Sequence, residues 1–404
     1  MDSKSNGKQS MFWYRITKLA GGFVSRFIFG RKYIRNEIKG VKGPLVIIAN
    51  HQASLDFVNL MGATKRPMTF VVSSSFYNTV PVKGIMKKIG VIPKQQFQTQ
   101  LADLKKMKEA IKQGKILVIY PAGLMCEDGL STPIPVGTYK FLKWIGADIY
   151  MAKTEGSYFS MPKWSKGMRK GKTYVDIYKL FSKEELKDME LSEVKEIAER
   201  ALTFDAYREQ ENRLVKFKKN DNIEGLENVL YMCPHCKSEF TVRVKDKSTV
   251  YCESCGYSQT SDKYGFLHKN GDTGEEIRYV SDWSRLIYSE LKDKIEKDGA
   301  IPLECDTEIH KINYEKKRYE KTGDGHIALC GNKFVLTGTV HGEEINLDVP
   351  IGTFASVPFK PGRHIELQFG DEIFRCVLSD GKLAMKFVNI VKIHYELNSL
   401  AQTK

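Results

Sequence analysis

The sequence lacks an uninterrupted run of about twenty apolar residues, which is what a bilayer-spanning helix requires. Its first residues lack the charged-then-apolar pattern and the small-residue cleavage site of a secretory signal, so we expect no export. It also lacks low-complexity tracts, and 42% of its 404 residues are hydrophobic. This composition indicates globular folding throughout, in two or three domains.

Acidic residues are too few to balance the basic ones, and the formal net charge is +14. An excess of this size suits either nucleic acid or an anionic membrane as a partner. In residues 11–30, basic side chains interrupt a set of large apolar residues that recur at three- and four-residue steps on one helical face. These are Phe12, Ile16, Leu19, Phe23 and Phe27. The segment is either a basic amphipathic helix lying among lipid headgroups or a helix docked on the protein's own core.

A histidine and an aspartate follow the apolar run of residues 45–49, which is short and aliphatic and therefore predicts a buried strand. His51 and Asp56 lie five positions apart on the turn that leaves this strand. The carboxylate can fix the imidazole tautomer and stabilise its charged form, so that the other ring nitrogen can accept a proton from a substrate hydroxyl. The alternative is a purely structural histidine.

Four blocks of sequence in a fixed order resemble the glycerolipid acyltransferases, the lysophosphatidic acid acyltransferase family. They are residues 48–56, 88–93, 117–123 and 147–152, and the resemblance covers about residues 40–215. It implies transfer of a fatty acyl group from acyl-CoA, acyl carrier protein or acyl phosphate to the hydroxyl of a lysophospholipid. His51 would be the general base and Asp56 would orient it, without a Ser or Cys nucleophile.

The chain departs from the family at the positions that bind glycerol phosphate. Ala122 stands where the third block has Glu, and Leu124 and Met125 stand where it has Thr-Arg. The second block of the family closes with an Arg, whereas the matching segment of this chain is Lys94-Gln95-Gln96. We expect Lys94, Gly123, Glu127 and Lys153 to contribute to substrate binding, with backbone N–H groups near Gly123 or around the His51 turn as candidate oxyanion donors. For Glu127 and Asp128, a solvated acidic turn is the alternative.

Short apolar runs alternate with helical spacing through the first half of the chain, which predicts an α/β fold with a mostly parallel sheet and flanking helices. Catalytic residues are expected at strand ends in such sheets. The expected strands cover residues 70–72, 116–120, 149–152 and 174–178, and the expected helices cover residues 82–89, 103–112 and 136–144, with two more within 182–210. A charged run at residues 216–222 is interpreted as a linker.

Two Cys-x-x-Cys pairs separated by fifteen residues match the four-thiolate zinc pattern. The predicted ligands of a structural zinc are Cys233, Cys236, Cys252 and Cys255. Tyr231, Phe240, Val242 and Val250 would form the small core of a zinc ribbon, and His235 is interpreted as a bystander. A redox role for the pairs is the weaker alternative, because it does not require a second motif.

The last hundred residues predict a helix at 284–297, several short strands between 327 and 378, and a closing helix at 383–400. This pattern resembles a small β domain with a capping helix, of a pleckstrin-homology-like kind. The predicted segments are therefore a membrane-associating segment (1–38), an acyltransferase-like domain (39–215), a linker and zinc ribbon (216–270), and a helix with a β-rich domain (271–404).

The resemblance favours a membrane as the partner, because a lipid acceptor has its hydroxyl at the interface. We expect a cytoplasmic enzyme, peripheral on the inner face of the cell membrane, that meets an anionic surface and a lysolipid acceptor. Acyl carrier protein is a candidate partner, whereas nucleic acid is not favoured, because the ribbon lacks interleaved Arg and aromatic residues. Two alternatives remain: an inactive lipid-binding scaffold, and a docking protein that binds nucleic acid or protein through the ribbon.

Overall fold

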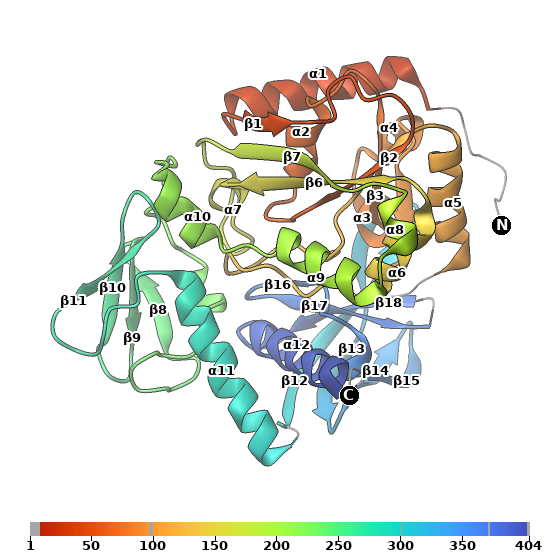
Figure 1. Ribbon diagram of the computed structural model, residues 1–404. Helices are drawn as coiled ribbons and strands as arrows, with labels where there is room; N and C mark the ends of the chain where they lie inside the picture. The colour runs from red at the N-terminus through yellow and green to blue at the C-terminus, as the bar shows by residue number, and fades with distance from the viewer. Residues whose placement is uncertain (1–8, 97–99, 300, 371, 402–404) are drawn as a thin grey trace. The chain divides into compact units, whose positions relative to one another are not determined.

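The computed structural model describes residues 9–96, 100–299, 301–370 and 372–401, which fold as two compact units (Figure 1). The first unit consists of the described parts of Met1–Cys126, Ile134–Ser160 and Arg169–Phe204. The second consists of Glu127–Pro133, Met161–Met168 and the described parts of Asp205–Lys404. Two short inner segments of the chain therefore belong with its C-terminal half.

The first unit is built on a seven-stranded sheet with the order β1-β7-β6-β2-β5-β3-β4. All neighbours in it pair in parallel except β6 and β7, which are antiparallel. This arrangement confirms the predicted α/β fold with a mostly parallel sheet. The strands are β1 (Lys32–Asn36), β2 (Leu45–Ala49), β3 (Met68–Ser73), β4 (Ile92–Lys94), β5 (Ile116–Ile119), β6 (Asp148–Glu155) and β7 (Tyr174–Phe181).

Helices cover both faces of this sheet, so β2 is buried along its whole length. Its alternate residues enter two cores, because successive side chains of a strand point to opposite faces. Val46 and Ile48 pack with α5 (Leu101–Lys112), α6 (Gly137–Ile145) and α9 (Leu191–Leu202). Leu45 and Ile47 pack in the core that contains Tyr14 of α1 (Met11–Phe27) and Leu60 of α2 (Asp56–Met61). The remaining helices of the unit are α3 (Ser74–Thr79), α4 (Lys83–Lys88), α7 (Ser157–Ser160) and α8 (Glu185–Asp188).

Helix α1 begins at an N-cap, where the Ser10 side chain accepts from the Trp13 amide. It packs on the first unit through Tyr14, Gly21 and Ser25, all of which are buried. The five large apolar residues predicted to share one face are all exposed, from 42% at Ile16 to 75% at Leu19, and so do not dock on the core of the unit. Among the helices in the described part of the chain, none combines a membrane-spanning length with a sufficiently apolar sequence.

The second unit begins with α10 (Ala206–Arg213) and an antiparallel sheet of the order β11-β10-β9-β8. Its strands are β8 (Val242–Lys245), β9 (Thr249–Cys252), β10 (Ser258–Ser261) and β11 (Leu267–Asn270). Residues 216–222, interpreted from their charges as a linker, do not form an exposed tether. Phe217 and Asn220 are buried, because the aromatic ring within the charged run packs into the unit.

The C-terminal part of the second unit contains α11 (Val280–Asp298), a seven-stranded antiparallel sheet and the closing helix α12 (Leu383–Ala401). The sheet order is β15-β14-β13-β12-β18-β17-β16. The predicted β-rich region with a C-terminal helix is therefore present, and its likeness to a pleckstrin-homology domain stays a prediction. The strands are β12 (Leu303–Asn313), β13 (Arg318–Cys330), β14 (Lys333–Val340), β15 (Glu343–Pro350), β16 (Phe359–Lys360), β17 (His364–Phe369) and β18 (Glu372–Leu378).

Candidate active site and metal centre

His51 and Asp56 lie on the turn between β2 and α2, at the carboxyl edge of the parallel strands. Nδ1 of His51 is 3.1 Å from Oδ2 of Asp56. The same carboxylate oxygen accepts the backbone N–H groups of Gln52 (2.8 Å) and Ala53 (2.9 Å). Asp56 is 2% exposed. Three donors thus fix one buried carboxylate oxygen, and the ring of His51 is held through Nδ1.

Further polar contacts hold the His51 turn against its neighbours. The Asn50 side chain donates to the Thr154 carbonyl and accepts from the Thr154 amide, both at 2.8 Å, which fastens the turn to β6. The Gln52 side chain accepts from the Tyr158 amide at 3.1 Å. Asn50 and Gln52 were not among the predicted site residues. Their signal in the sequence is the presence of two amide side chains directly after an apolar strand, where buried polar groups need partners.

Tyr120 is a second aromatic side chain of this site that the sequence analysis did not assign a role. It directly follows β5, the neighbour of β2, and its ring lies against His51 with centroids 4.4 Å apart and 31° between the planes. Burial, and to a smaller extent the charge of Asp56, raises the pKa of the Tyr120 hydroxyl well above its ordinary value. The hydroxyl therefore stays protonated at neutral pH. In the sequence, Tyr120 could have been found by its position directly before Pro121 in the third block.

Comparison with known proteins identifies this part of the chain. Residues 28–162 match the model of the family described as Acyltransferase. This part of the chain is an acyltransferase-family domain. The matched range contains both His51 and Asp56 and the strands that carry them.

Two curated plant proteins are similar to the acyltransferase domain. A chloroplastic 1-acyl-sn-glycerol-3-phosphate acyltransferase of Brassica napus is 26% identical over 157 residues, which are 36% of this chain and 45% of that protein. One of Arabidopsis thaliana is 26% identical over 140 residues, which are 34% of this chain and 39% of that protein. The chain thus spans less than half the length of these relatives.

One solved structure similar to this chain is the crystal structure of the 1-acyl-sn-glycerophosphate acyltransferase of Thermotoga maritima. It has 16% sequence identity and a TM-score of 0.40, and the match covers 50% of this chain and 78% of that one.

The other predicted substrate-binding residues of the acyltransferase domain have structural contacts of their own. Lys94 ends β4, and its ammonium donates to the Gln95 carbonyl at 3.0 Å. Burial lowers the pKa of Lys94, against the opposing effect of the Asp103 charge. Lys153 is half-buried on β6, and its charge lowers the pKa of Tyr178 against the larger effect of burial. A role for either lysine in substrate binding stays a prediction.

The Gly123 amide donates to the Tyr120 carbonyl at 2.9 Å, which closes a tight turn. Gly123 has a φ of +68°, a conformation that favours glycine. The Gly123 amide is therefore occupied within the turn of the third block, and an oxyanion role for the neighbouring amides or for those of the His51 turn stays a prediction.

Glu127 and Asp128 do not form the solvated acidic turn that was the alternative to a substrate-binding role. Both belong to the second unit and are buried, with exposures of 2% and 7%. The Glu127 carboxylate is ion-paired with Lys392 of α12, and Asp128 accepts the Leu130 amide at 3.0 Å. Burial and the neighbouring Glu127 charge raise the pKa of Asp128 to about 6. The solvated-turn interpretation is wrong, because Lys392 neutralises Glu127 inside the unit.

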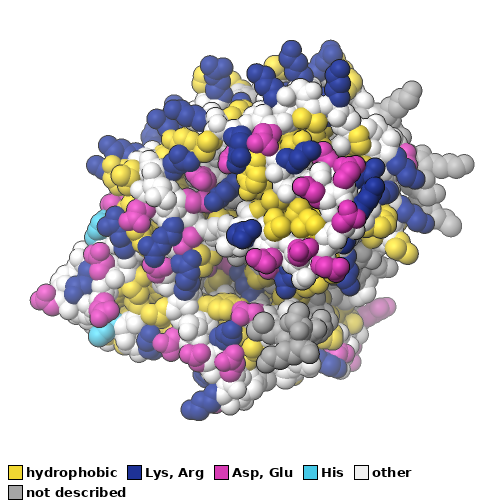
Figure 2. Space-filling model, in the orientation of Figure 1, with side chains coloured by type: hydrophobic (Ala, Val, Ile, Leu, Met, Phe, Trp, Pro, Cys, Tyr) yellow, Lys and Arg dark blue, Asp and Glu magenta, His cyan; other side chains and the backbone are white. Residues whose placement is uncertain are grey.

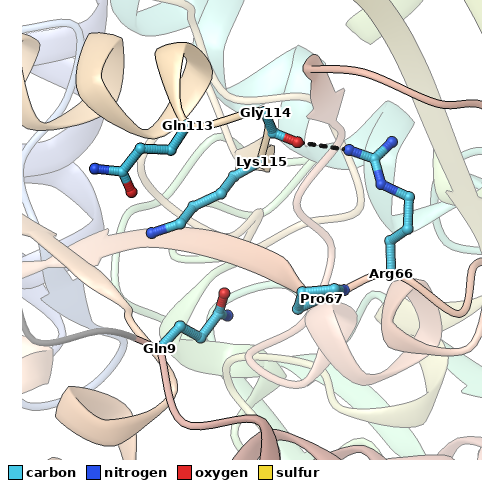
Figure 3. Close-up of a pocket in the computed structure, with 6 residues that line it drawn as sticks. All are labelled: Gln9, Arg66, Pro67, Gln113, Gly114 and Lys115. Carbon is cyan, nitrogen blue, oxygen red and sulfur yellow. Dashed lines mark hydrogen bonds between the residues drawn. The ribbon is translucent and has the colours of Figure 1, made fainter.

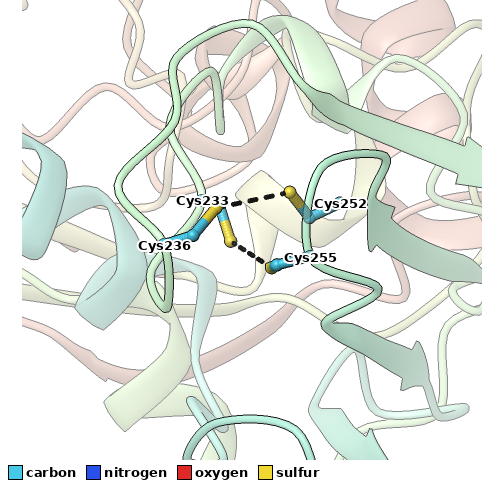
Figure 4. A group of neighbouring side chains, drawn as sticks. All are labelled: Cys233, Cys236, Cys252 and Cys255. Carbon is cyan, nitrogen blue, oxygen red and sulfur yellow. Dashed lines mark hydrogen bonds between the residues drawn. The ribbon is translucent and has the colours of Figure 1, made fainter.

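The four predicted cysteine ligands come together in the second unit (Figure 4). Their sulfurs all lie within 4.8 Å of one another, and the Cys233–Cys255 and Cys236–Cys252 separations are both 3.7 Å. A tetrahedral zinc with bonds of about 2.3 Å would separate its sulfurs by about 3.8 Å. The cluster can therefore hold such a metal ion. Of the predicted small core, Tyr231, Val242 and Val250 are buried, and the Phe240 ring stacks on Tyr231.

A surface hollow of about 370 Å³ lies in the acyltransferase domain but away from His51 (Figure 3). Pro67 and Lys115 in its wall precede β3 and β5, so the hollow is at the amino edge of the parallel strands, opposite the edge where the His51 turn lies. Arg66 donates to the carbonyls of Val41 (3.0 Å) and Gly114 (2.7 Å). These bonds give Arg66 a structural role, so the hollow is not the candidate active site.

Proposed function

We propose that this protein transfers a fatty acyl group from an activated donor to the hydroxyl of a lysophospholipid or related glycerolipid. The observation that carries the proposal is the His51–Asp56 pair, held at 3.1 Å within an acyltransferase-family domain. The two plant relatives, which are named as 1-acyl-sn-glycerol-3-phosphate acyltransferases, support this class of acceptor.

In the proposed reaction, His51 is the general base. Its Nδ1–H donates to Asp56, which leaves the lone pair of Nε2 to accept the proton of the acceptor hydroxyl. The resulting alkoxide attacks the carbonyl carbon of a thioester or acyl phosphate and forms a tetrahedral intermediate. When this intermediate collapses, the bond to the thiolate or phosphate breaks, and the imidazolium returns its proton to the leaving group. Asp56 stabilises the imidazolium and does not itself accept the proton.

We also propose that α1 holds the protein on a membrane surface. Its exposed apolar side chains include Phe12 (66%), Leu19 (75%) and Phe23 (61%), which is unusual for a helix packed on a globular unit. Arg15 and Arg26 are exposed on the same helix. Lys and Arg side chains gather, with hydrophobic ones among them, along the side of the first unit that carries α1 (Figure 2). An apolar helical face with adjacent cations suits an anionic interface, where each cation contributes about 1 kcal/mol.

Vesicle binding tests the membrane proposal. Replacing Phe12, Leu19 and Phe23 together by Ser should weaken binding to phosphatidylcholine–phosphatidylglycerol vesicles by at least about tenfold, because each large apolar side chain contributes roughly 1.5–3 kcal/mol on burial. Wild-type binding should also fall as salt is added. The matched control replaces Leu214 and Tyr314, which are exposed apolar residues of the second unit, and should bind as wild type. Equal binding of both variants would contradict the proposal.

Acyl transfer itself is tested by incubating the protein with vesicles, radiolabelled acyl donors and a panel of lysolipids. We expect labelled product from at least one pair of acyl-CoA, acyl carrier protein or acyl phosphate with a lysolipid. Vesicle binding without product from any pair would contradict catalysis and leave a lipid-binding scaffold. The departures at Ala122, Leu124 and Met125 favour that second candidate.

For the metal centre, we propose that zinc occupies the four-cysteine cluster and stabilises the ribbon. Four thiolates with tetrahedral spacing are the ligand set of structural zinc sites, and they leave no open position for a substrate. The cluster is therefore assigned to folding of the second unit and not to acyl transfer.

A further inference from the structure

Two buried oxygen atoms beside His51 have no hydrogen-bond partner among the described residues. They are Oδ1 of Asp56 and the hydroxyl oxygen of Tyr120. A buried polar atom without a partner is destabilising by about 1–3 kcal/mol, and more when it is charged. Native proteins satisfy nearly all such atoms with a side chain or an ordered water. The site therefore contains one unused donor and one unused acceptor.

Both atoms belong to residues in direct contact with the same imidazole. The Tyr120 ring lies 4.4 Å from the His51 ring, and Oδ2 of Asp56 lies 3.1 Å from Nδ1. Asp56 is also near enough to raise the pKa of the Tyr120 hydroxyl, although burial is the larger cause. A protonated hydroxyl and a carboxylate oxygen are a complementary donor and acceptor.

The hydrogen bonds of Asp56 are unevenly distributed. Oδ2 accepts from the amides of Gln52 and Ala53 as well as from His51, whereas Oδ1 accepts from none of the described residues. A donor to Oδ1 would fix the plane of the carboxylate and, through it, the orientation of the imidazole ring.

We propose that Tyr120 is a positioning residue of the catalytic pair, whose hydroxyl donates to Oδ1 of Asp56 either directly after a small rotation or through one bound water. The inference rests on the proposed acyl-transfer function. Tyr120 stands directly before Pro121 in the third block. It provides a second contact to the carboxylate in a domain that has lost charged residues elsewhere in the same block.

The test is the Tyr120→Phe variant, which keeps the ring against His51 and removes only the hydroxyl. We expect kcat to fall about tenfold, which is the net effect of one hydrogen bond to a charged group, and KM to change by less than about twofold. Among the described residues, Asp56 and Tyr120 contact the His51 side chain, and the amide of the titratable Cys126 donates to the His51 carbonyl at 3.2 Å. With one donor fewer, the carboxylate stabilises the imidazolium more, so the acidic limb of the pH profile should move to higher pH.

Tyr139→Phe is the matched control. The Tyr139 hydroxyl donates to Glu199 at 2.9 Å in the core on one face of the same sheet. Its loss should lower the thermal unfolding midpoint without moving kcat or the pH profile. Equal thermal midpoints of Tyr120→Phe and wild type would show that the catalytic effect is not partial unfolding.

A readout without substrate separates this inference from the proposed function. Histidine nitrogen NMR of the free protein reports the tautomer of His51 and the Nδ1–H bond to Asp56, and Tyr120→Phe should change these signals whether or not an acyl acceptor has been found. A wild-type protein without transferase activity would contradict the proposed function alone. Unchanged His51 nitrogen signals, or an unchanged kcat and pH profile in an active enzyme, would overturn the role of Tyr120.

Discussion

Glu127 is ion-paired with Lys392 in the second unit, and the adjacent carboxyl of Asp128 is influenced by the charges of both. The pKa of Asp128 rises to about 6 because burial and the Glu127 charge both oppose its ionisation. The folded state thus retains a proton that the unfolded chain releases near pH 4. Asp128 therefore favours folding most at low pH, and this contribution is lost as the pH rises from about 4 through 6.

Replacing Asp128 by Asn should consequently stabilise the protein at about pH 8, by roughly 1–3 kcal/mol, because the amide keeps an oxygen for the Leu130 bond and carries no charge. The gain should shrink at about pH 4.5, where the native carboxyl is mostly protonated. Denaturant unfolding at the two pH values measures it. Asp221→Asn, at an exposed position, should have little effect at either pH. A loss of stability at pH 8 would refute the assignment.

The contacts of single side chains could be predicted from the sequence where the two partners are close together along the chain. His51 and Asp56 lie together, as their five-residue spacing predicts, because one turn and its backbone amides bring them together. Glu127 and Lys392 are 265 positions apart, so no local pattern could reveal that the acidic turn is buried and neutralised. Tyr120 is an intermediate case, since its place in the third block was visible but its contact with His51 depends on the pairing of β2 and β5.

Among the elements, the ribbon follows most directly from the sequence, because each Cys-x-x-Cys turn positions its own two sulfurs. Removal of the metal should unfold this part of the second unit, since the binding free energy of a structural zinc contributes directly to folding. Trp283 of α11 is a suitable reporter, because it is 1% exposed and its indole donates to the Met232 carbonyl at 2.8 Å beside Cys233.

Chelation should therefore shift the tryptophan emission to longer wavelength, and metal analysis should find about one zinc per chain. Cys255→Ser should behave like the chelated protein, whereas Cys330→Ser, which changes an exposed thiol outside the cluster, should retain both zinc and emission. Purified protein that contains no zinc and does not respond to chelators would refute the metal centre.

Helix α1 shows what an amphipathic pattern can and cannot determine. The pattern predicted the helix and its apolar face, but it left open whether that face meets the protein or a lipid. In the structure the helix packs through its small and polar side, where a β-carbon at Gly21 would lie 3.4 Å from Val58 and where Ser25 donates to Asn59. Small residues permit this close packing, and the large apolar residues remain exposed.

Strand β12 was not predicted because its inward positions carry weak apolar signals. Cys305, Thr307 and Ile309 are buried and alternate with exposed Glu304, Asp306 and Glu308. The period is that of a strand, but a cysteine and a threonine do not form a clear apolar run. Backbone pairing with β13 and β18 stabilises β12 as a strand. The pairing with β18 involves residues far along the chain, so a local pattern does not reveal it.

For the whole molecule, the sequence predicted the types of sheet and helix better than it predicted which residues belong to each compact unit. Each parallel strand of the first unit is a short apolar run, so the α/β sheet could be predicted locally. Residues 127–133 and 161–168 belong to the second unit through contacts such as the bridge between Leu130 and Asp205, which the linear sequence does not show. The two units therefore differ from the four consecutive segments that were predicted.

The most direct test of the account is the kcat of His51→Ala in the acyl-transfer assay, measured beside His268→Ala. His268 also lies 3.1 Å from a carboxylate, Asp262, but it is exposed in the second unit. Loss of a general base should lower kcat by about 10²–10⁴-fold in His51→Ala, with an unchanged circular dichroism spectrum, and leave His268→Ala fully active. A His51→Ala protein that transfers acyl groups at the wild-type rate would contradict the account.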